Sequence, residues 1–112
     1  MTEVMDVETR IAQADSDFPA LFQLFGGYFH EDWRVEHENP AAALSAFTDE
    51  APPEAVREAA RELDALLELP LADDELGALL RRGFDCNYIP SNDGLSARSW
   101  LVAVRQRVQP GG

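Results

Sequence analysis

Apolar residues recur at helical spacing along most of this 112-residue chain. The clearest stripe returns every three or four residues, as one face of a helix does, and consists of Phe18, Leu21, Phe22, Phe25, Tyr28, Phe29 and Trp33. Ser16 or Asp17 can cap the start of this helix, and Pro19 is tolerated in its first turn. The pattern predicts an aromatic helix that runs out in the polar stretch 30–38.

Four further helices are predicted from shorter apolar stripes with start and stop signals. These signals are, in chain order, Asn39-Pro40, Pro52-Pro53, Pro70, Asp73-Asp74-Glu75, Gly83, Ser96 and Pro110. In the longest helix, after Pro53, the side expected to face solvent carries Glu54, Arg57, Glu58, Arg61, Glu62 and Asp64. The predicted fold is all-α, a small irregular bundle of about five helices without a convincing strand pair.

The length allows one domain with one core. Residues 1–15 lack a sustained apolar stripe, and we interpret them as an N-terminal tail or a short peripheral helix. Residues 16–110 are then the single helical domain. Phe22, Phe25, Tyr28, Phe29, Trp33 and Trp100 are expected to build its core, because aromatic rings at helical spacing bury large apolar areas.

Charge narrows the possible partners. The chain has 21 acidic residues against nine basic ones, all of them arginine, and a formal net charge of −12. Such a surface repels phosphate backbones and anionic lipid, so we expect no direct binding to nucleic acid or membranes, whereas a basic partner is attracted. Residues 1–50 hold eleven acids and two arginines, and residues 81–112 hold two acids and five arginines. An acidic face built from the N-terminal half is therefore predicted.

The cellular setting is predicted to be the cytoplasm. Cys86 is the single cysteine, so the chain cannot form an internal disulfide or a cysteine-rich zinc site. The N-terminus is acidic where a secretory signal is basic, and no apolar run reaches the roughly 18 residues of a membrane span. We expect the mature chain to start near Met1.

The densest polar cluster lies in residues 30–38. Its residue types could form a metal site or the active site of an enzyme. His30 and His37 are seven residues apart, roughly 10 Å along a helix, whereas zinc-binding histidine pairs on helices are four apart. Asp32 with Glu36 is a candidate acid–base pair, but no nucleophile, metalloprotease or dinucleotide motif accompanies it. Cys86 is expected to be a core residue. We predict no catalytic residue, no metal and no cofactor.

Two stretches resemble a known family. Residues 24–33, with the run Tyr28-Phe29-His30-Glu31-Asp32-Trp33, and the later Tyr88-Ile89-Pro90, Asp93-Gly94-Leu95 and Trp100-Leu101 are similar to the CdiI immunity proteins of bacterial contact-dependent growth inhibition systems. The resemblance spans about residues 18–108, and Glu31 stands where the family often has Gln. It implies a cytosolic, non-catalytic protein that binds and neutralises the toxic C-terminal domain of an effector, often a nuclease.

The acidic cluster indicates how such a toxin domain would be held. A nuclease must be cationic to bind its substrate, so carboxylates can occupy the place of phosphates and occlude the basic surface. The predicted partner-binding residues are Tyr28, Glu31, Asp32, Trp33, Glu36 and Glu38. Trp33 has two interpretations, a core residue or a partly exposed anchor.

Two other functions stay open at this stage. One is a general acidic interaction module, such as a nucleic-acid mimic for an unrelated basic partner. The other is a small metal-dependent enzyme at His30, His37 and nearby acids. The sequence does not fix the oligomeric state.

Overall fold

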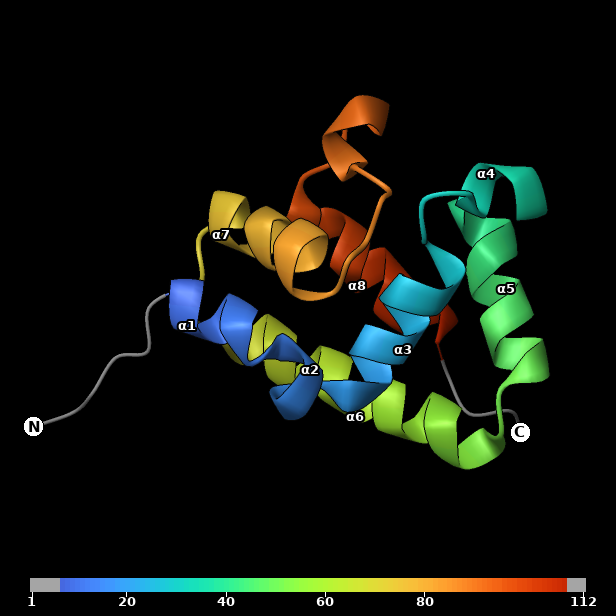
Figure 1. Cartoon of the computed structure of the whole chain (residues 1–112), viewed down its shortest axis with the longest axis horizontal. Coiled ribbons are helices and arrows are strands. Elements are labelled where there is room, and N and C mark those ends of the chain that lie inside the picture. Colours follow the sequence, from blue (N-terminus) through green and yellow to red (C-terminus); the bar gives the residue numbers. More distant parts are fainter. Residues whose placement is uncertain (1–6, 109–112) are drawn as a thin grey trace, which may run out of the picture.

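All regular structure within residues 7–108, the range that the computed structural model describes, is helical (Figure 1). The elements are α1 (Val7–Ala12), α2 (Ala14–Asp17), α3 (Pro19–Tyr28), α4 (Trp33–Glu36), α5 (Pro40–Glu50), α6 (Pro53–Glu68), α7 (Asp73–Ala78), the π-helical turn η1 (Leu79–Gly83), the 3₁₀ turn η2 (Pro90–Asp93) and α8 (Ala97–Arg107). The prediction of a small all-α bundle is confirmed. No helix in the described range has the length and apolar content needed to cross a membrane.

Local capping signals start α5 and α8 where the sequence predicts. The Asn39 side chain accepts a 2.8 Å hydrogen bond from the backbone N–H of Ala42. Ser96 Oγ accepts a 3.0 Å bond from the N–H of Ser99. Each side chain satisfies one of the N–H groups that have no partner inside the first helical turn.

The start of α3 is a correction. Neither Ser16 nor Asp17 caps it; instead, both carboxylate oxygens of Glu62 in α6 accept hydrogen bonds from the first backbone N–H groups, those of Ala20 at 3.2 Å and Leu21 at 3.0 Å. The prediction that Glu62 faces solvent is therefore wrong, since it is only 9% exposed. Burial raises the pKa of this carboxyl group above its ordinary value, while the two N–H donors act in the opposite direction.

The aromatic stripe is divided between two helices rather than carried by one. Helix α3 ends at Tyr28 and α4 begins at Trp33. In a continuous helix the N–H of Asp32 would bond the carbonyl of Tyr28, but here it donates to Nδ1 of His30 at 3.0 Å. This local bond accompanies the turn that interrupts the helix.

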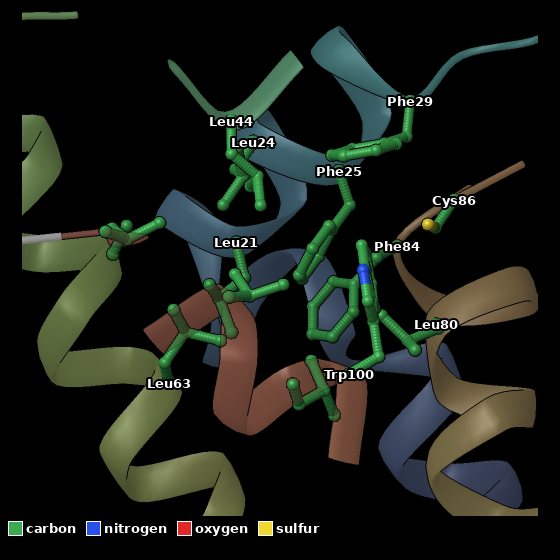
Figure 2. Close-up of a cluster of buried hydrophobic side chains, with 14 of the residues drawn as sticks. Leu21, Leu24, Phe25, Phe29, Leu44, Leu63, Leu80, Phe84, Cys86 and Trp100 are labelled. Atoms are coloured by element: carbon green, nitrogen blue, oxygen red, sulfur yellow. The ribbon is translucent and has the colours of Figure 1, made fainter. Parts of the chain in front are cut away.

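Aromatic rings from α3, α4, α8 and residues 84–90 meet in the core. Figure 2 shows Phe25, Phe29, Phe84 and Trp100 among them. Trp100 is central to it, with ring-centre distances of 5.7 Å to Phe25, 5.5 Å to Phe29 and 4.8 Å to Tyr88. Helix α8, which carries Trp100, packs against α5, α6 and α7. Among the rings expected in the core, Phe22 is an exception, at 37% exposed.

The N-terminal helices pack closely on η1. Residues 1–6 of the predicted tail, and residues 109–112 beyond the last helix, lie outside the described range. From Val7 the chain is helical, and Ala14 of α2 is fully buried. A Cβ atom added to Gly83 would lie 3.0 Å from the Ala14 Cβ and 2.9 Å from Leu79 Cδ1. The glycine therefore allows α2 to approach η1.

Candidate functional site

Two buried rings hold the polar stretch 30–38 against the core. Phe29 is fully buried and Trp33 is 2% exposed, with 5.5 Å between their ring centres. The ring of Tyr88 meets Trp33 edge-on at 5.8 Å. With the stretch fixed at these two points, Glu31 and Asp32 between them lie exposed at the surface.

Trp33 is thus placed in the core, the first of its two interpretations. Its neighbour Arg34 lies over the indole, with the guanidinium carbon 4.6 Å from the ring centre. A cation over an aromatic face is attracted by the negative face of the ring. The contact covers the indole further, so Trp33 has little surface left to offer a partner.

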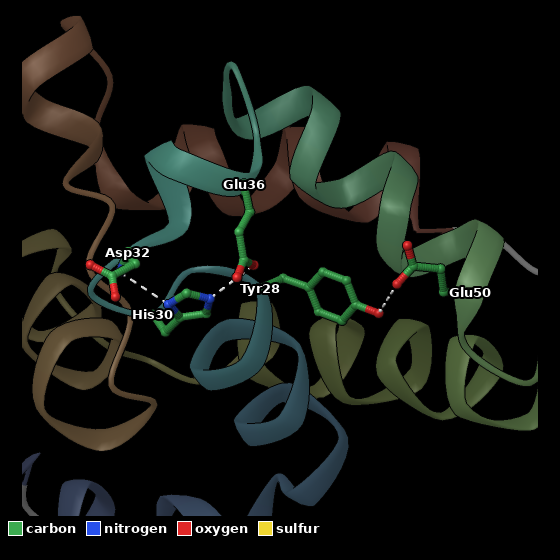
Figure 3. A network of polar contacts seen from close by, with 5 residues as sticks. All are labelled: Tyr28, His30, Asp32, Glu36 and Glu50. Carbon is green, nitrogen blue, oxygen red and sulfur yellow. Dashed lines mark hydrogen bonds and ion pairs between the residues drawn. The ribbon is translucent and has the colours of Figure 1, made fainter.

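His30 is fully engaged by its own segment (Figure 3). Its Nδ1 accepts the hydrogen bond from Asp32 N–H, and its Nε2 lies 3.1 Å from Glu36 Oε1. Because Nδ1 acts as an acceptor, the proton of the neutral ring belongs on Nε2, which then donates to Glu36. Neither ring nitrogen is left for a metal ion.

His37 lies away from this pair and against the ring of Tyr28, with 6.1 Å between ring centres. Within residues 7–108, no three histidine, cysteine, aspartate or glutamate side chains come together as a ligand set for a metal. The structure therefore does not bring His30 and His37 to one site.

The four predicted carboxylates of this stretch, Glu31, Asp32, Glu36 and Glu38, are all exposed. Glu36 accepts the hydrogen bond from Nε2 of His30. The side chains of the other three have no ion pair in the described part of the chain. Glu31, Asp32 and Glu38 therefore present negative charges to solvent that no ion pair within residues 7–108 neutralises.

Tyr28 connects this stretch to the end of α5. Its hydroxyl donates a 3.0 Å hydrogen bond to Oε1 of Glu50, and its ring meets Phe47 edge-on at 5.6 Å (Figure 3). Burial, and then the bond to Glu50, raise the pKa of Tyr28, so the phenol keeps its proton and remains a donor. Glu50 was not predicted as a site residue, because no local pattern reports a contact between α3 and α5.

An open, mainly apolar pocket of about 290 Å³ lies beside this hydrogen bond, between α3, α5 and α6. Its lining residues are Ala20, Gln23, Tyr28, Phe47, Ala51, Pro52 and Ala55. Small side chains on α3, on α6 and between α5 and α6 leave the space open. Tyr28 lines the pocket, and its ring also meets His37 of the polar stretch, so the two features adjoin at this residue.

Cys86 lies in the core, as expected. It is 2% exposed, and burial raises the pKa of its thiol to about 12. Its Sγ lies 3.6 Å from the carbonyl oxygen of Tyr88. A buried thiol of this kind is protonated at neutral pH and a poor nucleophile.

Comparisons with known proteins agree on one family. The family model described as CdiI immunity protein matches residues 17–108. A chain in the crystal structure of a CdiA-CT/CdiI complex from Y. kristensenii is similar, with 31% sequence identity and a TM-score of 0.78, over 83% of this chain and 99% of that one. No curated protein sequence matches significantly.

Proposed function

Because this chain belongs to the family of CdiI immunity proteins, we propose that it binds and neutralises the C-terminal toxin domain of a contact-dependent growth inhibition effector, in the cytoplasm of the cell that makes it. The observation that carries the proposal is its similarity, at 31% identity and over most of both chains, to a chain of a CdiA-CT/CdiI complex. The family match, over residues 17–108, includes the aromatic core and the polar stretch 30–38.

The contact surface is assigned to the exposed carboxylates of Glu31, Asp32, Glu36 and Glu38. They are exposed, three of them lack an ion pair in the described range, and the whole chain carries a net charge of −12. A toxin domain that cleaves nucleic acid needs a cationic surface for phosphates. Carboxylates that pair with those cations exclude the substrate by occupying its place.

Tyr28 is assigned to the same surface, and Trp33 to its support. Tyr28 is partly exposed and lines the pocket that adjoins the polar stretch 30–38. The buried ring of Trp33 anchors α4 to the core. Truncation of Trp33 would weaken binding through the fold, and not through a lost contact.

Binding, rather than catalysis, is the mode of action. The protonated thiol of Cys86 and the two engaged ring nitrogens of His30 support this, because the strongest candidates for chemistry are both committed to the structure. Neutralisation then requires stoichiometric complex formation. The long-range attraction of an acidic protein for a basic one raises the association rate, which favours rapid protection.

Co-expression tests this function. Cells that produce the cognate toxin domain are expected to stop growing. Co-production of this protein should restore growth, and the protein should copurify with the toxin in equal amounts. The matched control is a toxin domain of similar positive charge from a different effector, which this protein should not neutralise. Rescue from both toxins would indicate a general acidic module; rescue from neither would contradict the proposal.

A further inference from the structure

The pocket between α3, α5 and α6 has a mainly apolar floor, and one carboxylate, that of Glu50, lies at its rim. Its floor consists of the rings of Tyr28 and Phe47 and of small residues on α3, on α6 and in the connection between α5 and α6. Glu50 stands at the rim, since its Oε1 accepts the hydrogen bond from the hydroxyl of Tyr28, which lines the pocket. Asp49 and Glu54, next to the lining segment in sequence, are also exposed.

We propose that this pocket receives one arginine or lysine side chain of the toxin domain, with the methylene stem on the apolar floor and the charged head on Glu50. This inference rests on the proposed function and goes beyond it, because it assigns a specific anchor point to the complex. The pocket residues were not among the predicted partner-binding residues, apart from Tyr28.

The shape and the charge of the pocket both fit this occupant. Long basic side chains bury their aliphatic stems along apolar surface and keep the charged head at a polar rim. A volume of about 290 Å³ leaves room for such a side chain, and the pocket is open to solvent on one side. A purely apolar occupant would leave the rim carboxylate of Glu50 facing it without a charged partner.

Glu50 is already oriented for this contact. One carboxylate oxygen is held by Tyr28, and Oε2 has no hydrogen-bond partner among residues 7–108. A carboxylate has acceptor sites for several hydrogen bonds, so the free oxygen can accept from a guanidinium or ammonium group while the other stays bound to Tyr28. Holding the side chain in advance reduces the entropy lost when the toxin binds.

The pocket also lies where an anchor is most effective. It adjoins the polar stretch 30–38 through Tyr28, whose ring contacts both His37 of that stretch and Phe47 of the pocket. Binding hot spots are buried side chains in well-packed pockets, surrounded by contacts that exclude water. The exposed acids then govern the rate of encounter, and the pocket governs how long the complex lasts.

Dissociation rates of the complex with the cognate toxin domain test the assignment. Ala55→Leu fills the pocket without a change in charge, and Glu50→Gln removes the charge at its rim. Each is expected to raise the dissociation rate at least about tenfold, with the association rate changed less than about threefold. Ala65→Leu, an exposed position on the same helix and outside the pocket lining, is the matched control and should leave both rates unchanged.

Each result has a defined meaning. If Ala55→Leu dissociates at the parent rate, the pocket is empty in the complex and the inference is wrong. If Ala55→Leu speeds dissociation but Glu50→Gln does not, the occupant is apolar, and the assignment of a basic side chain is overturned. Failure of the parent protein to bind the toxin would instead refute the proposed function itself.

A folding defect is controlled separately. Helix content and thermal unfolding are measured for every variant, and Tyr28→Phe provides a second probe if Ala55→Leu does not fold. This change keeps the ring on Phe47 but removes the donor to Glu50. Dissociation about threefold to tenfold faster is expected from the lost hydrogen bond. An unchanged rate would show that Glu50 is not held for a ligand, contrary to the inference.

Discussion

Both oxygens of the Glu62 carboxylate lie at the start of α3, where Oε1 accepts a 3.0 Å hydrogen bond from the N–H of Leu21, a residue 41 positions away in sequence. The positive end of the α3 dipole lies at the same place. This contact ties α6 to α3, the helix that ends at Tyr28 and so positions the proposed interface. Glu62, although it is an acidic residue in the core, therefore serves to hold two helices together.

Glu62→Ala should lower the free energy of unfolding by about 1–3 kcal/mol, because it leaves the first N–H groups of α3 without their acceptor. Urea unfolding followed by circular dichroism measures the change. Glu68→Ala, an exposed position without an ion pair on the same helix, is the control and should stay within about 0.5 kcal/mol of the parent. Equal effects of the two substitutions would show that the Glu62 contact contributes nothing.

The pH dependence of stability should carry the signature of Glu62. Because its pKa is raised in the folded state, the folded protein binds more protons than the unfolded one, and stability falls as pH rises from the ordinary glutamate pKa of about 4.3 through the folded value. Glu62→Gln lacks this ionisation. The stability of the parent relative to this variant should therefore decrease across that range and level off above it.

Unfolding free energies of both proteins, measured at a series of pH values, give this difference directly. The comparison removes the contributions of other acids, such as Asp73, whose pKa is lowered by hydrogen bonds from Arg98 and Ala97. A difference that grows with pH would mean that the helix N–H groups outweigh burial at Glu62.

Two glycines should respond oppositely to the same substitution. Gly83→Ala places a Cβ atom 3.0 Å from the Ala14 Cβ, and overpacking of this kind costs about 1–3 kcal/mol. Gly77, within α7, has open space around it, so Gly77→Ala should stabilise the protein by about 0.4–1 kcal/mol. Thermal unfolding of the pair tests the close contact between α2 and η1, and a neutral Gly83→Ala would refute it.

Cys86 should be unreactive in the folded protein. With its pKa raised to about 12 by burial, the thiolate is scarce at pH 8, and the sulfur is also inaccessible. A chromogenic disulfide reagent should therefore label the thiol only as fast as the protein opens, and rapidly after denaturation. Immediate labelling of the native protein at the rate of a free thiol would contradict the core placement.

Much of the fold could be predicted because its signals are local. Asn39 and Ser96 cap helices through bonds to residues three positions away, which the sequence displays directly. Glu62 and Glu50 could not be predicted in the same way. Their partners lie 41 or 42 and 22 residues away, so their roles depend on how α3 packs against α6 and α5.

The burial of Trp33 is hard to predict because its sequence neighbours give conflicting signals. Its spacing from Phe29 indicates the core, whereas the acids around it suggest the surface. The structure satisfies both patterns by ending α3 at Tyr28 and starting the short helix α4 at Trp33 itself, which buries the indole and leaves Glu31 and Asp32 outside. That turn is accompanied by the hydrogen bond from Asp32 N–H to His30 Nδ1, which helical periodicity does not report.

The charge placement of the proposed interface is best tested with two variants of equal net charge. One neutralises Glu31, Asp32, Glu36 and Glu38. The other neutralises four exposed acids on α2, α6 and α7, none of which has an ion pair in the described range: Asp15, Asp17, Glu68 and Asp74. Each removes four negative charges, so a difference between them reports position alone.

The most direct measurement is the association rate of each variant with the toxin domain as a function of salt concentration. Neutralisation around α4 is expected to slow association about tenfold at low salt and to flatten its salt dependence, whereas the α2, α6 and α7 variant should stay within about twofold of the parent. Equal rates for the two variants, or a parent rate without salt dependence, would contradict the claim that the carboxylates of residues 31–38 receive the toxin.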